Sequence, residues 1–428
     1  MQRIGKYEIR SKLGEGATAA VFLGYDPFAG HEVAIKVVFP EVLRDETFGR
    51  MYRHLLLNEA SLAGKLQHPH IAQIYDAVVD AEHGYIVMEY VPGGTLERFS
   101  RPEGLLPLDR LVEIVFKCTR ALDYAHHLGI THRDIKPANI LLTSREDAGG
   151  DIKISDFGSA LMTTSDQTQV ANVGSPAYMS PQQVREMPLN HQTDIYSLGV
   201  VMYQLLTGHL PFEATNNYSM IYQICNAEPT PPSVLRADIP ASLDAVVARA
   251  MQKDLDKRYS SWEEFSHDLA QAFRNRRLNA RAHEFFDSEK FETLRSLEFF
   301  RDFSDVEMWE VVRFSEWEQV SPGTVIMKDG EPGGFFCFLA DGELRVEKRR
   351  RRLTALVAGD CFGEMAVIGR STGSRNADVI AVTDSRIIRI RGDALRRASE
   401  ACRMHFYAAF LDVVTRRLAM ANTRIAAV

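Results

Sequence analysis

The chain has 428 residues, of which 45% are hydrophobic and 25% charged, a composition that excludes a disordered chain and predicts two or three folded domains. Its 50 Lys and Arg residues against 57 Asp and Glu give a net charge of −7, which excludes a dedicated nucleic-acid-binding protein. The five cysteines are scattered and form no Cys-x-x-Cys pair, so a disulfide framework and a zinc site of that kind are excluded too.

Membrane insertion is not expected from the hydropathy of the chain. The most apolar stretch, Ser197–Leu206, is shorter than the roughly 20 residues that a transmembrane helix needs. The N-terminal segment, Met1–Arg10, lacks the apolar core of a signal peptide. We therefore expect a soluble, cytoplasmic protein without a transmembrane segment, in which the thiols stay reduced.

Residues 7–90 predict several strands around one long helix. The segments Tyr7–Leu13, Ala20–Tyr25 and Glu32–Val38 are short, rich in β-branched and aromatic residues, and separated by glycines. Helical periodicity extends from Leu43 to Leu66, and Gly84–Tyr90 has the apolar pattern of a buried strand. This part of the chain is expected to form a small, strand-rich lobe.

Helical patterns dominate from Leu105 to Phe273, with two short strands predicted at Ile140–Leu142 and Ile152–Ser155. Residues 274–303 are charged and contain neither Pro nor Gly, which predicts a stiff helical connector. The following segment, Phe314–Ile390, alternates short strands with glycines and predicts a small β-barrel. Helical residues from Asp393 onward close the chain. The fold class is therefore α+β.

Two motifs in the first lobe suit a bound phosphate. The segment Gly14-Glu-Gly16 lies between two predicted strands, where backbone N–H groups approach phosphate oxygens without a Cβ in the way. On the next strand, Val33-Ala34-Ile35-Lys36 ends in an ammonium group. Glycine-rich turns and strand-end lysines are common in proteins that bind no phosphate, so neither motif identifies a site alone.

Two later motifs are far more specific. The segment His132-Arg-Asp-Ile-Lys-Pro-Ala-Asn139 supplies a base for a substrate hydroxyl, a lysine for a phosphate and an amide for a metal ion. The triplet Asp156-Phe-Gly158 follows a short predicted strand and adds a carboxylate for Mg²⁺. The order and spacing of all four motifs exclude coincidence.

With these motifs, residues 7–273 resemble a Hanks-type Ser/Thr protein kinase, particularly the bacterial branch. The resemblance implies a bilobed kinase fold that binds ATP and Mg²⁺ and phosphorylates Ser or Thr hydroxyls of protein substrates. It implies that Asp134 accepts the hydroxyl proton, within the catalytic set Asp134, Lys136, Lys36 and Glu59. The residues that it implies for ATP binding are Leu13, Gly14, Gly16, Val21, Ala34, Lys36, Met88, Glu89, Val91, Asn139 and Asp156. Of these, Asn139 and Asp156 are implied to hold Mg²⁺.

Glu59 is the expected ion-pair partner of Lys36, because it lies nine residues before His68-Pro69, where kinases of this type place it. Glu46 is a rival, although it sits at the start of the predicted helix. The segment Gly174–Pro181 resembles the substrate-facing loop of Ser/Thr kinases, and Asp194 resembles the Asp that braces the catalytic loop.

Two positions depart from the pattern of this family. Ala19 replaces the third glycine of the phosphate loop, and Gln182 replaces the Glu of the Ala-Pro-Glu triplet. That Glu normally pairs with an Arg that Arg258 matches, so we expect a hydrogen bond without charge assistance and a less firmly anchored segment. No catalytic group is lost by either substitution.

Arg133 resembles the Arg of kinases in which a phosphorylated activation loop docks beside the catalytic Asp. The candidate acceptors are Thr163, Thr164, Ser165 and Thr168. Loops exposed to water are rich in Ser and Thr, so the sequence selects no single site.

A second, weaker pattern lies in residues 295–428. In Gly359–Ala366 a Phe-Gly-Glu turn opens a short helix, whose backbone N–H groups suit a phosphate and whose carboxylate suits a sugar hydroxyl. Arg375, in Ser374-Arg-Asn-Ala377, can pair with a phosphate in fork geometry.

This pattern resembles a cyclic-nucleotide-binding domain, which implies a small jelly-roll-like β-barrel with flanking helices. The helical connector expected from the composition, at 274–294, would join this domain to the kinase domain. Glu364 is implied to bind the ribose 2′-hydroxyl and Arg375 the cyclic phosphate. The full set of implied contacts is Gly363, Glu364, Met365, Ala366, Arg375 and Asn376. Asn376 takes a position where Ala or Thr is usual, so the choice between cyclic AMP and cyclic GMP stays open.

Three functions fit these patterns. The leading hypothesis is a Ser/Thr kinase regulated by a cyclic nucleotide, and its rival is a constitutive kinase whose barrel is a nucleotide-free docking or dimerisation module. A non-catalytic ATP-binding scaffold is disfavoured by the complete catalytic set. Similar barrels in transcription regulators continue into a helix-turn-helix module, for which this sequence has no room after the last helix, so no nucleic-acid partner is expected.

Overall fold

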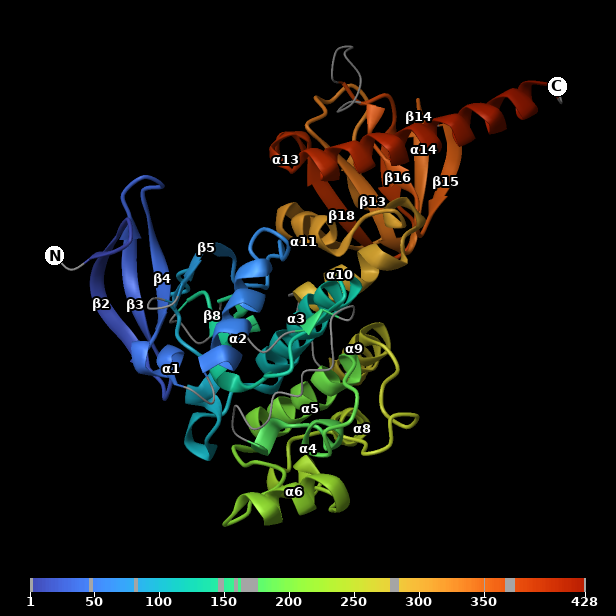
Figure 1. Cartoon of the computed structure of the whole chain (residues 1–428). Coiled ribbons are helices and arrows are strands. Elements are labelled where there is room, and N and C mark those ends of the chain that lie inside the picture. Colours follow the sequence, from blue (N-terminus) through green and yellow to red (C-terminus); the bar gives the residue numbers. More distant parts are fainter. Residues whose placement is uncertain are drawn as a thin grey trace. The chain divides into compact units, whose positions relative to one another are not determined.

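The computed structural model describes residues 3–45, 49–80, 84–144, 150–157, 161–162, 176–277, 285–349, 351–365 and 374–426, with only the backbone at 161–162, 273–277 and 420–426. The chain divides into two compact units, Met1–Ala280 and Arg281–Val428, each of which is described by itself. Figure 1 shows the elements of both.

The first unit begins with an antiparallel sheet of strand order β1-β2-β3-β4-β6-β5. The strands are β1 (Arg3–Ile4), β2 (Tyr7–Glu15), β3 (Ala19–Asp26), β4 (His31–Val38), β5 (Ile74–Val79) and β6 (Gly84–Glu89). Side chains alternate between the two faces of a sheet. Val33, Ile35 and Val87 pack with Tyr7 into a core on one face, so Lys36, the neighbour of Ile35 on β4, points to the other face.

The long helix expected from Leu43 to Leu66 is replaced by two shorter helices, α1 (Pro40–Arg44) and α2 (Gly49–Ser61). The ψ angle of 128° at Asp45 ends α1. Beyond α2, Gly64 has a φ of +76°, a left-handed conformation that few residues other than glycine adopt. The strand β5 was not predicted, because Asp76 interrupts the apolar pattern of this edge strand.

The rest of the first unit is mainly helical (Figure 1). Its helices are α3 (Leu108–His127), α4 (Pro181–Val184), α5 (His191–Thr207), α6 (Asn217–Asn226), α7 (Pro232–Leu235), α8 (Ala241–Ala250) and α9 (Trp262–Arg277), with 3-10 turns η1 (Leu96–Phe99), η2 (Pro102–Gly104), η3 (Pro137–Asn139) and η5 (Pro176–Tyr178). Nearly all of α5 is buried, so its apolar residues are not confined to one side of the helix. Both α3 and α8 pack against it.

Two pairs of short strands lie in this helical part. The strands β7 (Ile130–Thr131) and β10 (Leu161–Met162) form one pair, and β8 (Ile140–Leu142) and β9 (Ile152–Ile154) form the other. Because Ile140 is paired with Ile154, the chain enters β8 from Asn139 beside the point where it leaves β9 for Asp156. The backbone N–H of Ser155 donates to the carbonyl of Asn139 at 2.9 Å and fixes this arrangement.

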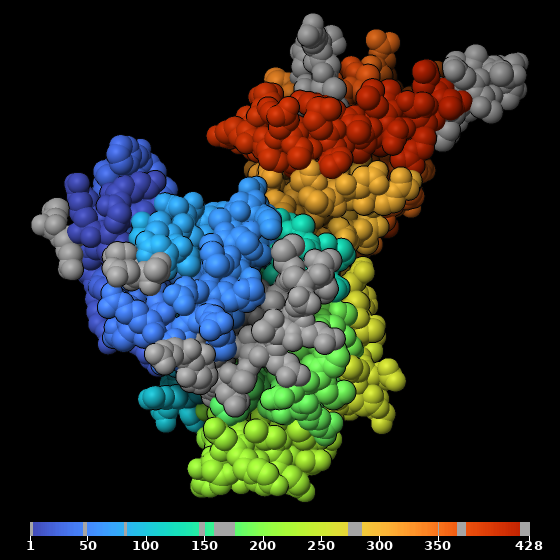
Figure 2. Space-filling model, viewed as in Figure 1, coloured from blue at the N-terminus to red at the C-terminus, as the bar shows by residue number. Residues whose placement is uncertain are grey.

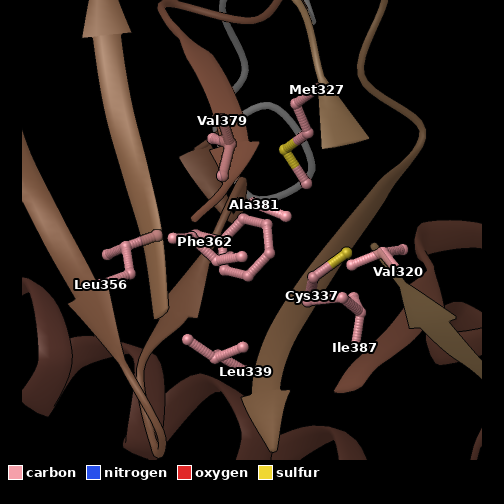
Figure 3. Packing of buried hydrophobic residues seen from close by; sticks show 10 residues of the cluster. Val320, Met327, Cys337, Leu339, Leu356, Phe362, Val379, Ala381 and Ile387 are labelled. Carbon is pink, nitrogen blue, oxygen red and sulfur yellow. The ribbon is translucent and has the colours of Figure 1, made fainter. Parts of the chain in front are cut away.

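The second unit has two antiparallel four-stranded sheets, of order β11-β18-β13-β16 and β12-β17-β14-β15. The strands are β11 (Ser315–Val320), β12 (Val325–Met327), β13 (Phe335–Asp341), β14 (Glu343–Lys348), β15 (Arg351–Val357), β16 (Cys361–Phe362), β17 (Asp378–Ala381) and β18 (Ser385–Arg391). Side chains of both sheets, among them Cys337, Leu339, Phe362 and Val379, pack into one core between them (Figure 3). The predicted jelly-roll-like barrel is therefore present.

The helical elements of this unit are α10 (Asp287–Ser296), η6 (Glu298–Phe300), α11 (Asp305–Phe314), α13 (Gly392–Arg397) and α14 (Glu400–Ala426). The other face of β13 packs against η6 and α14. Phe336 and Phe338 alternate with Cys337 and Leu339 along the strand, and their rings contact Phe410 of α14 and Phe300 of η6 at centroid distances of 5.1 and 4.9 Å, respectively.

The stretch 274–303 is not one continuous helix. The helix α9 extends to Arg277 and α10 begins at Asp287, while Phe286 between them has an extended conformation (φ −72°, ψ 154°). Among the described residues we find no helix that could span a membrane.

Candidate functional site

The face of the first sheet opposite its apolar core collects four of the residues predicted to contact ATP. In the strand register Val21 lies opposite Lys36, and Ala34 lies opposite Met88. Since residues two apart on a strand share a face, Ala34 and Lys36 point the same way, and their cross-strand partners point with them. Ala34 and Met88 are buried.

Lys36 lies between two carboxylates. Its Nζ is 3.4 Å from Oε2 of Glu59 on α2 and also bonds Oδ1 of Asp156. Desolvation lowers the pKa of Lys36, but the two carboxylates outweigh it and raise that pKa above its ordinary value. Burial raises the pKa of Glu59 to about 7, against the opposing effect of Lys36. The predicted Lys36–Glu59 ion pair is thus present, whereas Glu46 lies outside the described residues.

A second cluster of side chains surrounds Asp134. Nζ of Lys136 donates to Oδ2 of Asp134 at 2.7 Å, and Nδ2 of Asn139 donates to the same oxygen at 3.1 Å and to the Asp134 carbonyl at 2.8 Å. The positive charge of Lys136 also helps to lower the pKa of Asp156, although less than Lys36 does, and it acts against the desolvation of that carboxyl. The two clusters are therefore neighbours.

A buried carboxylate holds the loop that carries Asp134. Asp194, on α5, accepts the backbone N–H groups of His132 and Arg133, both at 2.7 Å. The Nε2 atom of His132 bonds the carbonyl of Ser155 at 3.0 Å, and its Nδ1 accepts the backbone N–H of Asp134 at 3.3 Å. This network fixes the segment before Asp134 against the segment before Asp156.

Two residues of these segments have strained backbones. Arg133 and Asp156 have φ angles of 70° and 66°, which are uncommon for residues other than glycine. Such strain is concentrated at functional sites, where the surrounding structure over-determines the conformation. Here the hydrogen bonds of Asp194 hold Arg133, and the ion pair with Lys36 holds Asp156.

The remaining predicted ATP contacts lie at the end of β2, on the turn after it, and at or just beyond the end of β6. Leu13 is exposed on β2, and Gly16 donates its N–H to the Ala19 carbonyl at 2.9 Å, which closes the turn. A Cβ at Gly14 would meet no atom within 4 Å, so the loop leaves open space at this position. Val91 is buried, and the Glu89 carboxylate pairs with Lys153 at 3.0 Å.

The substitution at Gln182 leaves a buried arginine without a carboxylate partner in the described hydrogen bonds. Nη1 of Arg258 donates to Oε1 of Gln182 at 3.2 Å, and its other bonds go to the backbone carbonyls of Gln192, Gln252 and Lys253. Desolvation lowers the pKa of Arg258 to about 10.

Replacing Gln182 by Glu is expected to stabilise the first unit. Arg258 is already desolvated, so a carboxylate at 182 gains a charge-assisted hydrogen bond, which contributes about 1–3 kcal/mol. Thermal unfolding of the full chain measures the change, with Gln271→Glu on the exposed surface of α9 as control. A lower unfolding temperature for Gln182→Glu alone would show that desolvating the new carboxylate outweighs the ion pair.

The candidate phosphorylation sites Thr163, Thr164, Ser165 and Thr168, and the segment 174–175, lie outside the described residues. Arg133 itself is described, and its Nε is buried with no hydrogen-bond partner among the described residues. Burial lowers the pKa of this guanidinium despite the charge of Asp194.

In the second unit, Arg375 is buried against the turn that carries Gly363. Its Nη1 donates to the carbonyl of Gly363 at 2.9 Å, its Nη2 donates to the carbonyl of Phe335 at 2.6 Å, and the guanidinium lies 4.5 Å above the Phe335 ring. Gly363 has a φ of 79°, and a Cβ there would lie 2.7 Å from Nη1 of Arg375. Only glycine therefore fits this turn beside the guanidinium.

Glu364 follows directly and is also buried. Its Oε1 pairs with Nη1 of Arg417 on α14 at 2.6 Å, and Arg417 also donates to the carbonyl of Cys361. The sequence did not single out Arg417, because its partner lies 53 residues away and no local pattern connects them.

The other predicted contacts of the second unit are less enclosed. Met365 and Asn376 are exposed, and Ala366 lies outside the described residues. The structure thus brings Gly363, Glu364 and Arg375 together at one end of the barrel.

Comparison with models of known protein families agrees with the geometry of both sites. A family model of the protein kinase domain matches residues 7–270, and one of the cyclic nucleotide-binding domain matches residues 317–402. The first match covers more than half of the chain, so the chain belongs to the protein kinase family, and a cyclic nucleotide-binding domain follows its kinase domain.

Individual bacterial kinases are similar over a large part of the chain. A probable serine/threonine-protein kinase of Clostridium acetobutylicum is 34% identical over 272 residues, which are 63% of this chain and 40% of that protein. Serine/threonine-protein kinase PksC of Streptomyces coelicolor is 36% identical over 60% of this chain and 47% of its own length. PknB of Mycolicibacterium smegmatis is 38% identical over 62% of this chain and 42% of its own length. The chain thus spans less than half the length of these curated relatives.

Proposed function

We propose that the chain is an ATP-dependent Ser/Thr protein kinase. The observation that carries this proposal is the pair of adjacent clusters, in which Lys36, Glu59 and Asp156 lie next to Asp134, Lys136 and Asn139. We assign the kinase domain to residues 7–273, the connector to 274–294 and the second domain to 295–428.

In this proposal Asp134 is the general base. Its carboxylate accepts the proton of a Ser or Thr hydroxyl while the hydroxyl oxygen bonds to the γ-phosphorus of ATP and the bond from that phosphorus to the ADP oxygen breaks. Lys136, which now bonds Asp134, would contact the transferred phosphoryl group. Lys36 would hold the α- and β-phosphates, and its ion pair with Glu59 keeps the ammonium directed at them.

The side chains present fit ATP with Mg²⁺. The nitrogen of the Asn139 amide donates to Asp134, so its oxygen is the atom that would bind a cation, and Asp156 would add a carboxylate. Oxygen ligands of this kind suit Mg²⁺. When bound, the ion neutralises charge on the phosphates. The apolar wall formed by Val21, Ala34 and Met88 suits an adenine ring.

The acceptor residue tests the kinase proposal. The full chain is incubated with ATP, Mg²⁺ and peptides containing Ser, Thr or Tyr, and the modified residue is identified by mass spectrometry. We expect phosphoserine or phosphothreonine. Phosphotyrosine alone would contradict the proposal of a Ser/Thr kinase.

We further propose that a cyclic nucleotide binds the second domain and regulates the kinase. Arg375 and Glu364 support this proposal, because both are buried charges at one end of the barrel and suit a cyclic phosphate and a ribose hydroxyl, respectively. Through Arg417 the Glu364 carboxylate is also connected to α14, so a ligand at Glu364 would change how this helix is held. The nucleotide is cyclic AMP or cyclic GMP.

Replacing Arg375 by Lys is expected to weaken cyclic-nucleotide binding by roughly 10- to 100-fold, because the charge remains but the two-pronged bond to a phosphate is lost. Calorimetry on the full chain with cyclic AMP and cyclic GMP measures the change. Arg352→Lys on the exposed β14–β15 hairpin is the matched control.

One observation favours a second candidate, a constitutive kinase with a nucleotide-free barrel. Arg375 is already bonded to two carbonyls and Glu364 to Arg417, so both charges are satisfied without a ligand. If neither nucleotide binds wild type in the calorimeter, this candidate replaces the regulated kinase, and the kinase assignment itself is unaffected.

We also propose that a phosphate on one of the candidate Thr or Ser residues between 163 and 168 pairs with Arg133. The Nε of this buried guanidinium, which has no hydrogen-bond partner among the described residues, supports the proposal.

A further inference from the structure

The last helix of the second unit presents an apolar stripe to solvent. On α14 the exposed apolar residues follow each other at alternating intervals of three and four, and their exposed fractions lie between 42% and 67%. They are Met404, Tyr407, Leu411, Val414 and Leu418. Ala421 and Ile425 continue the same spacing in the sequence. Figure 2 shows α14 in red on the surface of its unit.

This stripe is distinct from the face of α14 that packs on the barrel. Cys402, Phe406 and Phe410 are buried at intervals of four residues, and the rings of Phe406 and Phe410 pack against Phe336. The helix therefore has two apolar faces, of which its own unit covers only one. Beyond Phe410, no described side chain up to Ala419 is buried. A helical end with so little packing gains little stability from its own unit.

Side-chain bonds to its own unit fix the stripe in its outward orientation. His405 is hydrogen-bonded to Glu307 at 2.8 Å, and Arg417 forms an ion pair with Glu364 at 2.6 Å. These bonds engage polar side chains of α14 with its own unit. Arg403, which flanks the stripe, donates to the carbonyl of Arg396 at 3.4 Å. The two basic residues nearest the stripe, Arg403 and Arg417, are thus both bonded within their own unit.

We propose that α14 pairs with α14 of a second copy of this chain in a parallel two-stranded coiled coil. Alternating intervals of three and four residues, sustained over about three heptads, are the pattern of a helix that packs along another helix. Met404, Leu411 and Leu418 take the a positions, and Tyr407 and Val414 take the d positions. In a parallel, in-register pair, each a or d residue packs against the same residue of the partner helix.

The a and d residues form the seam between the two helices, and the residues beside this seam favour the parallel arrangement. The e positions are uncharged (Ala408, Thr415), whereas the g positions include Arg403 and Arg417. In a parallel pair, each g residue lies near an e residue of the partner, so like charges do not meet. An antiparallel pair would bring g positions together and place arginines of the two copies side by side.

The barrel limits the assembly to two copies. Phe410 occupies a g position and Phe406 a c position, and both are buried against the barrel. One flank of the seam is therefore covered by the helix's own unit, which leaves room for one partner helix and not for a ring of several.

Sedimentation of the full chain tests the proposal. We expect wild type at micromolar concentration to sediment at twice the chain mass of 48.2 kDa. Leu418→Glu should sediment as a monomer, because it buries a charge in the seam. Its neighbour Ala419→Glu adds the same charge outside the seam and should remain a dimer. Kinase activity of both variants on a peptide, compared with wild type, checks that they are folded.

A cysteine at a d position tests the orientation. In a parallel, in-register pair, the two copies of Val414→Cys face each other and should form a disulfide-linked dimer on mild oxidation, whereas wild type should not. A wild type that sediments as a monomer overturns the proposal, and so does a dimer that survives Leu418→Glu. A dimer that Leu418→Glu dissolves but that Val414→Cys does not cross-link overturns the parallel register.

Discussion

Replacing Asp134 by Asn is expected to lower kcat by about 10²–10⁴-fold, the range that a general base contributes. An amide does not accept the proton of the substrate hydroxyl, so the nucleophile loses its activation. The amide oxygen of Asn at this position still accepts the hydrogen bond from Lys136, and the bond from Asn139 to the backbone carbonyl of residue 134 is unchanged. We therefore expect the fold and the affinity for ATP to be retained.

Steady-state kinetics with a peptide substrate and a separate measurement of ATP binding distinguish these effects. Asp238→Asn is the control, since Asp238 pairs with Arg236 in an exposed turn. If Asp134→Asn keeps the wild-type kcat, Asp134 is not the general base. Loss of ATP binding together with kcat would instead assign to Asp134 a structural role.

The second large effect is expected from Lys36→Met, which removes the cation between Glu59 and Asp156. Loss of one preorganised electrostatic contact to the phosphates should lower the rate by about 10²–10³-fold. The variant also leaves the buried Glu59 without its cation, at a cost of at most about 3–5 kcal/mol in stability.

The loss of stability should depend on pH. Burial already raises the pKa of Glu59 to about 7, and removing Lys36 raises it further. A native pKa above the unfolded value means that the native state holds the proton more tightly, so stability falls as pH rises through the native pKa. We thus expect the deficit of Lys36→Met to be larger at about pH 9 than at about pH 6.

The double variant Lys36→Met with Glu59→Gln separates stability from catalysis. It removes the unpaired carboxylate, so chemical denaturation should show that most of the lost stability returns, while the rate of phosphoryl transfer stays low. Recovery of the rate together with stability would mean that Lys36 acts only by supporting the fold.

Much of the two kinase clusters was predictable, because the residues of each motif stand at fixed spacings within a short segment of the sequence. Asp134, Lys136 and Asn139 lie within six residues of sequence, and the local turn alone brings their side chains together. Glu59 was a less direct inference from its distance to His68-Pro69, and the ion pair with Lys36 is present. From the Gln at position 182 we predicted a hydrogen bond to Arg258 in place of an ion pair, and that bond is present.

Contacts that depend on packing were harder to predict. The strand β5 escaped prediction because Asp76 breaks its apolar pattern, although its pairing with β6 holds it in the sheet. The stretch 274–303 was expected to be a helical connector, but helix propensity does not reveal the extended residue Phe286. Arg417 joins Glu364 only because α14 folds back on the barrel, a fact that no local sequence pattern carries.

The central claim is most directly tested by the rate of phosphoryl transfer from ATP to a Ser/Thr peptide, measured on the full chain with Mg²⁺ while cyclic AMP or cyclic GMP is titrated. We predict transfer by wild type and almost none by Asp134→Asn. The wild-type rate should change with at least one of the two nucleotides, and Arg375→Lys should need roughly 10- to 100-fold more of that nucleotide for the same change. A wild type that transfers no phosphate under any of these conditions would contradict the account.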